Sequence, residues 1–263
     1  RCKSIEALNE TWCLNLWSLA YGSFEQVPVL RPDIWHHPSF KLAWSEFNSG
    51  SYVEFAAHQA GILKRLTKHP VGTDMMPADG VDYGDMHAGL DLVQFNHYDG
   101  MEGLPRASFW MGLCRTVKST PWWNTETATC WNGSVTANGY KEPGFCRANS
   151  WLPLALGGEA NLYWLWRQHP AGQELMHGAV VSSQGRPLHI FEEVQEIAAG
   201  FSKAGEFIRG TSVTPSPLAL HFSHRSAWLF HHQPMVNKFD YQHNLVERVY
   251  RPLLGAQLRP DIL

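Results

Sequence analysis

A glutamate at the end of a strand-like, tryptophan-rich run is the residue best placed to do chemistry. Glu126 is the second-last residue of the run Pro121–Thr127, three positions after the second of two adjacent tryptophans. Burying a carboxylate beside apolar rings costs free energy, so its position at the end of a predicted strand indicates a functional role. One ionised carboxylate that attacks carbon is half of what glycoside hydrolysis requires.

A second acid and a histidine follow downstream. Glu174 and His177 lie three residues apart in Gly172–Gly178, so on a helical turn they point the same way. Two other interpretations stay open, an ordinary surface pair and half of a di-metal site in a helical bundle. A single Glu-x-x-His in a chain that mixes strands and helices disfavours the metal site. The order of strand, acid, aromatic strand, acid and histidine indicates a sugar-processing site on the rim of a parallel barrel.

The composition agrees with a carbohydrate partner. The 263 residues include 12 tryptophans, whose faces stack on sugar rings, although many tryptophans simply fill a core. The formal net charge is −3, from 21 basic and 24 acidic residues of scattered sign. The sequence has no basic stripe of the kind that would predict a nucleic-acid partner. It also has no lysine-rich amphipathic face that would predict binding to a membrane surface.

The cysteines predict neither disulfides nor a metal site. They are odd in number, widely spaced and contain no C-x-x-C pair: Cys2, Cys13, Cys114, Cys130 and Cys146. Buried thiols of a reducing compartment are the expected state, which predicts a cytoplasmic location. No apolar run is long enough to cross a bilayer, and no signal peptide opens the chain. We expect no metal and no cofactor.

Strand and helix patterns alternate along most of the chain, which predicts parallel βαβ units. The expected strands are 70–76, 90–98, 122–125 and 161–166, and the expected helices are 5–17, 51–68, 107–118, 144–156 and 190–208. Polar or aromatic residues end each strand: Asp74, then Asn96, His97 and Tyr98, then Glu126, then Arg167. Strand ends of this kind form the active face of a (β/α)₈ barrel. A doubly wound sheet is less favoured, because no glycine-rich phosphate loop follows any of the predicted strands.

The pattern changes after a Ser/Thr/Pro-rich linker at Thr211–Pro217. Residues 215–230 predict a strand and an aromatic loop, Phe239–Leu254 predicts a helix, and Arg259–Leu263 predicts a further strand. We therefore expect residues 1–210 to be part of a barrel and residues 211–263 to begin a second α/β domain. The chain is expected to be a fragment at both ends.

Together these motifs resemble the β-galactosidases of glycoside hydrolase family 42 over essentially the whole chain. The matching segments are Ser4–Trp12 with Leu16-Trp17-Ser18, the pair Trp166-Arg167, the Gly-x-Glu-x-x-His of Gly172–His177, and Phe239-Asp240-Tyr241. The resemblance implies the C-terminal half of a (β/α)₈ TIM barrel, strands 5–8, followed by the start of a flavodoxin-like trimerisation domain. It also implies a cytoplasmic homotrimer.

The resemblance assigns roles residue by residue. Glu126 matches the catalytic nucleophile, and Glu174 and His177 match the pair that holds sugar hydroxyls. Trp17 matches one aromatic wall of the pocket, Trp131 is a candidate for the second, and Tyr98 is expected near the nucleophile. Hydrogen-bond donors around Glu126 should favour its ionised form.

The implied function is retaining hydrolysis of terminal β-D-galactosides by two carboxylates. The general acid/base glutamate belongs to an Asn-Glu pair expected upstream of residue 1; Asn9-Glu10 is not that pair. The alternatives are a related barrel glycosidase acting on β-glucosides, mannans or arabinosides, and a carbohydrate-binding protein without catalysis.

Overall fold

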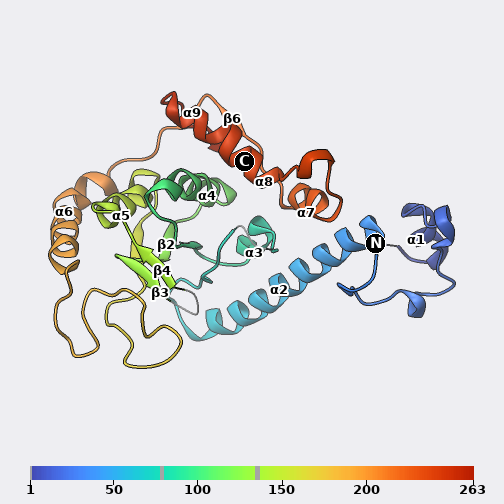
Figure 1. The fold of residues 1–263 in the computed structure, drawn as a ribbon, viewed down its shortest axis with the longest axis horizontal. Coiled ribbons are helices and arrows are strands. Elements are labelled where there is room, and N and C mark those ends of the chain that lie inside the picture. The colour runs from blue at the N-terminus through green and yellow to red at the C-terminus, as the bar shows by residue number, and fades with distance from the viewer. Residues whose placement is uncertain (1, 78–79, 134–136) are drawn as a thin grey trace.

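A parallel sheet forms the centre of the molecule. The computed structural model describes residues 2–77, 80–133 and 137–263. In those ranges β1 (Val93–His97), β2 (Trp122–Thr127) and β5 (Ala160–Tyr163) pair side by side in the order β1-β2-β5, and both pairs are parallel. Figure 1 shows this sheet with helices packed above it. The predicted parallel βαβ arrangement is confirmed.

The helices between these strands cover the sheet. α4 (Leu104–Val117) joins β1 to β2, and α5 (Phe145–Ala155) joins β2 to β5. Eight consecutive residues of α4, 107–114, are buried, because the helix has the sheet on one side and C-terminal elements on the other. Phe95, Phe109 and Trp122 form the centre of this core. α6 (Phe191–Arg209) packs outside α5, as predicted for residues 190–208.

The segment 70–76 is extended but is not a strand, so that prediction is wrong. It runs beside β1 and makes two separated backbone hydrogen bonds, Asp91 N–H to Val71 O at 2.8 Å and Asn96 N–H to Met75 O at 3.1 Å. Between them, a Cβ at Gly72 would collide with the Gln94 side chain. The two bonds are too far apart to form a continuous ladder.

The second helix is much longer than expected. α2 (Pro38–Leu66) has 29 residues and begins well before Ser51, with proline in its first turn. At 1.5 Å per residue it is roughly 44 Å long. The N-terminal segment, which contains α1 (Ile5–Thr11), lies beyond the end of α2 that is remote from the sheet (Figure 1).

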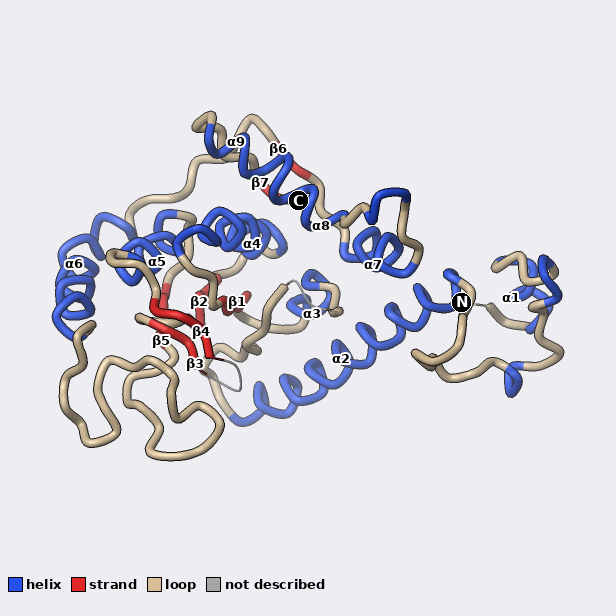
Figure 2. The backbone as a smooth tube through the Cα atoms, viewed as in Figure 1, coloured by secondary structure: helices blue, strands red, loops and turns tan. Residues whose placement is uncertain are grey.

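Shorter elements complete the first 210 residues. α3 (Tyr83–Ala88) precedes β1, and an antiparallel hairpin of β3 (Trp131–Gly133) and β4 (Ala137–Tyr140) follows β2. Single 3₁₀ turns occur at Leu16–Ser18, Phe24–Gln26 and Met101–Gly103. Long loops, drawn in tan in Figure 2, connect β5 to α6. None of the helices in the described residues combines the length and apolarity needed to cross a bilayer. The cytoplasmic location stays a prediction.

The C-terminal residues form a separate two-stranded sheet. β6 (Ala219–Leu220) pairs in parallel with β7 (Asp261–Ile262), so the last predicted strand has a partner. The aromatic loop expected within 215–230 is instead the helix α7 (His224–His232), capped by Ser223. A 3₁₀ turn at Val236–Lys238 precedes α8 (Tyr241–His243), a π-helical stretch Asn244–Tyr250 and α9 (Arg251–Gly255).

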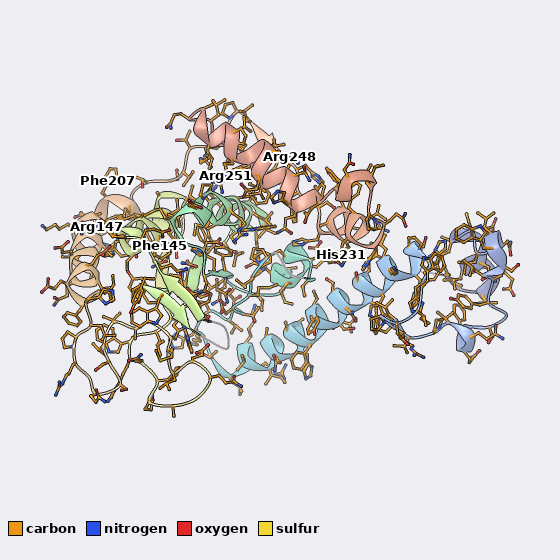
Figure 3. The ribbon with its side chains drawn as sticks, viewed as in Figure 1. Phe145, Arg147, Phe207, His231, Arg248 and Arg251 are labelled. Carbon is orange, nitrogen blue, oxygen red and sulfur yellow. The ribbon has the colours of Figure 1, made fainter. Side chains whose placement is uncertain are left out.

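This C-terminal unit rests on the helix that follows β1. Ile262 packs so closely on Gly112 of α4 that a Cβ there would lie 3.0 Å from its side chain. Arg251, labelled in Figure 3, donates a hydrogen bond to the carbonyl of Glu102 at 3.0 Å. Residues 211–216 cross between the units without regular structure. The boundary at residue 211 stays a prediction.

Candidate active site

The carboxyl ends of the parallel strands bring four expected site residues together. Glu126 is the penultimate residue of β2, and Tyr98 directly follows β1. The loop after β5 carries Glu174 and His177 back to the same edge of the sheet. The ring of His177 meets that of Tyr98 edge to face, with centroids 5.6 Å apart.

Tyr98 makes the central contact of the group. Its hydroxyl donates a hydrogen bond to Oε1 of Glu126. Burial raises the pKa of Tyr98 well above its usual range, and the Glu126 carboxylate raises it further. The phenol therefore stays protonated and acts as a permanent donor to the carboxylate.

The acidity of Glu126 reflects opposing influences. Burial raises its pKa above the usual value for a glutamate, the negative charges of Asp74 and Glu174 raise it further, and donation from Tyr98 lowers it. Tyr98 is thus a donor of the expected kind, but burial and acidic neighbours outweigh it. The adjacent polar residues do not donate to Glu126. Asn124 donates to Asn161 at 2.6 Å, and Thr125 donates to Asp74 and to the carbonyl of Phe95.

Glu174 is half-buried and held by aromatic neighbours. Trp164 Nε1–H donates to its Oε2 at 2.9 Å, and His169 Nε2 lies 3.6 Å from the same oxygen. Trp164 and His169 were not singled out by the sequence analysis. The signal that could have found Trp164 is the aromatic-rich run Tyr163–Trp166, which begins at the last residue of β5.

His177 is buried and its ring is engaged by the backbone. Nε2 lies 3.1 Å from the carbonyl of Trp164, and the Gly133 N–H donates to Nδ1 at 3.4 Å. This pattern assigns the proton to Nε2. Burial lowers the pKa of His177, so the ring is neutral near pH 7. In this structure the histidine ties the β5 loop to the β3–β4 hairpin.

Trp131 lies beside the same loop. Its indole N–H donates to the carbonyl of Met176, and its ring stacks on His189 with centroids 5.9 Å apart and planes 11° apart. Tyr140 of β4 approaches the same ring at 5.1 Å. The hairpin therefore presents an aromatic cluster next to Glu174 and His177, and this is consistent with a wall of a sugar pocket.

Trp17 does not join this group in the structure. Its side chain is 83% exposed and contacts Trp35, with ring centroids 6.0 Å apart. The physical reason is the length of α2, which separates the N-terminal segment from the strand ends (Figure 1). In the described residues Trp17 lies apart from the strand-end group, and its role as an aromatic wall stays a prediction.

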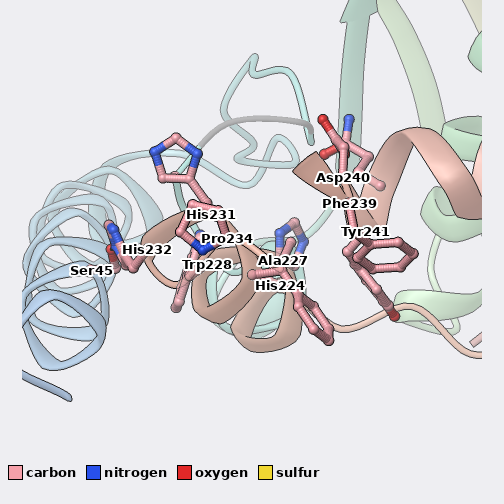
Figure 4. Close-up of a pocket in the computed structure, with 13 residues that line it drawn as sticks. Ser45, His224, Ala227, Trp228, His231, His232, Pro234, Phe239, Asp240 and Tyr241 are labelled. Atoms are coloured by element: carbon pink, nitrogen blue, oxygen red, sulfur yellow. The ribbon is translucent and has the colours of Figure 1, made fainter. Parts of the chain in front are cut away.

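A cavity of about 800 Å³ lies elsewhere, between α2 and the C-terminal helices (Figure 4). Ser45, Trp228, His231 and His232 are among its lining residues, and Ser45 Oγ lies 2.7 Å from His232 Nε2. None of the strand-end residues above lines it. Within the described ranges, no group of three or more His, Cys, Asp or Glu side chains is arranged to hold a metal ion.

Comparison with known proteins gives one consistent family. The sequence model of the glycoside hydrolase family 42 β-galactosidases matches residues 1–204. The chain is 30% identical to β-galactosidase YesZ of Bacillus licheniformis over 268 aligned positions, covering all of this chain and 40% of YesZ. It is 28% identical to YesZ of Bacillus subtilis, covering 98% and 39% of the two chains.

Solved structures of β-galactosidases have the same fold as this chain. A β-galactosidase of Halorubrum lacusprofundi superposes with a TM-score of 0.89 at 25% identity, over 99% of this chain and 41% of that one. The enzyme of Bacillus circulans gives 0.91 at 23% identity, which shows the shared fold over all of this chain and 41% of that one. The expected α/β class, with part of a (β/α)₈ barrel, is confirmed. The chain spans about 40% of the length of the curated relatives it matches. It belongs to the glycoside hydrolase family 42 β-galactosidases.

Proposed function

From this membership, we propose that the whole protein hydrolyses terminal, non-reducing β-D-galactosides by a double displacement with retention. The observation that carries the proposal is Glu126, a half-buried carboxylate at the carboxyl end of β2 that accepts a hydrogen bond from Tyr98. A carboxylate in this position can approach a sugar bound across the strand ends. Two relatives of this chain, the YesZ proteins of Bacillus licheniformis and Bacillus subtilis, are named β-galactosidases.

In the proposed mechanism, Glu126 forms a bond to the anomeric carbon while the glycosidic C–O bond breaks. A second carboxyl group protonates the departing oxygen, then removes a proton from the water that hydrolyses the galactosyl ester. The resemblance assigns this group to an Asn-Glu pair upstream of Arg1. Tyr98 keeps Glu126 oriented and supports its negative charge before attack.

The loop after β5 supplies the proposed sugar contacts. Glu174 is half-buried, and its carboxylate can accept hydrogen bonds from sugar hydroxyls while Trp164 fixes its orientation. His177, with both ring nitrogens engaged, is proposed to position this loop. Trp131 is proposed as an aromatic wall. A contact between sugar and Trp17 stays a prediction for the whole protein.

We further propose that residues 1–210 belong to the catalytic barrel and that residues 211–263 begin a flavodoxin-like domain. The parallel β6–β7 pair with its intervening helices supports the second assignment. The homotrimer is proposed from the family resemblance. The proposed partners are β-galactosides, without nucleic acid or membrane.

The nucleophile is tested in the intact protein. We expect Glu126→Gln to lose several orders of magnitude in kcat on nitrophenyl β-galactoside, and azide to rescue Glu126→Ala as the inverted galactosyl azide. The matched control is Glu159→Gln, an exposed glutamate at the opposite end of the sheet. Near-normal turnover by Glu126→Gln would contradict the assignment. Faster hydrolysis of nitrophenyl glucoside, mannoside or arabinoside than of the galactoside would mean that the enzyme acts on another sugar. If the unsubstituted protein bound galactose without turning over any galactoside, the protein would be a carbohydrate-binding protein and not an enzyme.

A further inference from the structure

A second carboxylate, Asp74, joins the ends of two strands next to Glu126. It lies on the extended segment that runs beside β1, anchored there by the hydrogen bond from Asn96 N–H to Met75 O at 3.1 Å. One oxygen of Asp74 accepts from Asn96 Nδ2 at 2.7 Å. The other accepts from Thr125 Oγ1, immediately before Glu126.

These contacts fix the strand end that carries the proposed nucleophile. Asn96 and Glu126 are paired neighbours in the β1–β2 register, just after the register shift at Phe95/Asn96. Thr125 also donates to the carbonyl of Phe95 at 3.2 Å, so its hydroxyl is shared between β1 and Asp74. Asp74 therefore spans the irregular point of the sheet, where the backbone ladder alone does not hold the two strands in a regular register.

We propose that Asp74 is a positioning residue for Glu126: it holds the end of β2 against the end of β1 and places a second negative charge beside the nucleophile. This inference rests on the proposed function. Asp74 is exposed, whereas Glu126 is half-buried. The negative charge of Asp74 therefore disfavours ionisation of Glu126 and raises the pKa of Glu126.

The electrostatics support this role. Burial is the largest cause of the raised pKa of Glu126, and the negative charge of the nearby Asp74 raises it further. Among the described residues, the ionisable groups near Glu126 include Tyr98, whose hydroxyl binds it, and Glu174 and His177 on the β5 loop, where His169 lies 3.6 Å from Glu174. Lys141 Nζ donates to the carbonyl of Tyr98 at 2.7 Å. A more basic carboxylate is a better nucleophile, provided that it remains ionised at the working pH.

The test compares the pH dependence of kcat/KM on an aryl β-galactoside for the intact parent and Asp74→Asn. The amide keeps the shape of the side chain and removes its charge. We expect the acid limb, which follows ionisation of Glu126, to move to lower pH, because the charge of Asp74 raises the pKa of Glu126. We also expect kcat near neutral pH to fall about tenfold, because a less basic and less firmly held carboxylate attacks more slowly. Asp74→Ser gives a second way of removing the charge should the asparagine variant fail to fold.

Two further variants separate charge from architecture. Asp74→Asn combined with Asn96→Asp exchanges the partners of the 2.7 Å bond and returns a negative charge next to Glu126; we expect the acid limb to return toward that of the parent. The matched control is Asp91→Asn. Asp91 accepts from Val71 N–H at 2.9 Å and so holds the other end of the same extended segment, away from Glu126. We expect its acid limb to stay in place.

Labelling with a 2-deoxy-2-fluorogalactosyl fluoride distinguishes the two possible failures. Absence of the label from Glu126 in the parent would overturn the proposed function. If Glu126 is labelled but the acid limb of neither Asp74→Asn nor Asp74→Ser moves, the positioning role of Asp74 is overturned. An equal shift in Asp91→Asn would also overturn it, because the effect would then come from the segment as a whole.

Discussion

The hydroxyl of Tyr98 donates a hydrogen bond to Glu126, and this contact links the end of β1 to the end of β2. The same ring packs edge-on against His177. Tyr98 therefore connects the proposed nucleophile to the β5 loop. A single phenol both stabilises a negative charge and fixes the distance between two parts of the site.

Tyr98→Phe should make Glu126 harder to ionise. Burial already raises the pKa of Glu126 and donation from Tyr98 lowers it, so removing the donor raises the pKa further. We expect the acid limb of kcat/KM in the intact protein to move to higher pH, opposite in sign to the Asp74 variants. A lost hydrogen bond to a charged group costs about 1.5–3 kcal/mol, or roughly 10- to 150-fold in kcat/KM. Tyr52→Phe, an exposed tyrosine of α2, serves as control. An acid limb at the parental pH would contradict this role.

Glu174→Ala should weaken transition-state binding rather than remove the chemical step. Its carboxylate is offered to sugar hydroxyls, and we expect a loss of roughly 10- to 150-fold in kcat/KM on aryl galactosides. Trp164→Phe removes the 2.9 Å bond that orients Glu174 but keeps the Glu174 carboxylate, so its loss should be smaller. Glu192→Ala, at an exposed position in the first turn of α6, is the matched control. Parental kcat/KM in Glu174→Ala would remove Glu174 from the sugar subsite.

His97 should make stability depend on pH. The ring is 3% exposed, and burial lowers its pKa to about 4, although the nearby Asp99 carboxylate acts in the opposite direction. Below the ordinary histidine pKa of about 6.5 the unfolded chain binds a proton that the folded protein does not, so stability is full above that pH. It is lost as the pH falls toward 4, by about 3 kcal/mol in total.

The measurement is Tm between pH 7 and pH 4.5 for the parent and His97→Phe. Phenylalanine preserves the stacking on Phe95, whose ring lies 5.4 Å from that of His97, and cannot take up a proton. We expect the variant to lose less Tm on acidification than the parent. His58→Gln, exposed on α2, should behave like the parent. Parallel Tm curves for parent and His97→Phe would exclude His97 as a source of acid sensitivity.

Arg115→Met should loosen the C-terminal unit. Arg115 pairs with Asp261 of β7, with side-chain exposures of 18% and 14%, so the ion pair is largely shielded from water. Removing it leaves Arg259, 3.1 Å away, as the remaining ionic partner of Asp261. The lost charged hydrogen bond should cost roughly 2 kcal/mol, seen as a lower Tm and faster proteolysis between residues 211 and 217. Arg147→Met breaks an exposed pair with Glu196 and should have little effect. Equal cleavage rates in the two variants would contradict the prediction.

Periodicity located most of the elements that carry the site. The strands near Phe95 and Trp122 and the helices between them appear where apolar spacing predicted them. The early start of α2 also had a signal, because Phe40, Trp44 and Phe47 have helical spacing and their rings contact one another. The lack of continuous strand pairing at 70–76 had no comparable signal, since it depends on how β1 approaches Gly72.

The site itself was only partly visible in the sequence. Glu126, Tyr98, Glu174 and His177 were selected one by one, and the structure gathers them at one edge of the sheet. The links between them depend on strand register and loop paths, which composition does not determine. Two such links are the contact of Asp74 with Thr125 and the engagement of both His177 nitrogens by the backbone. The functional roles of the four site residues stay predictions.

The groups that surround Glu126 come from three different connections. Asp74 lies before α3, Tyr98 follows β1, and Glu174 lies in the loop after β5. A substitution in any one of these loops can adjust the acidity of the carboxylate while β2 and the core beneath it stay unchanged. The working pH of such an enzyme is therefore open to gradual adaptation, by mutation or by protein engineering, without exchange of the reacting group.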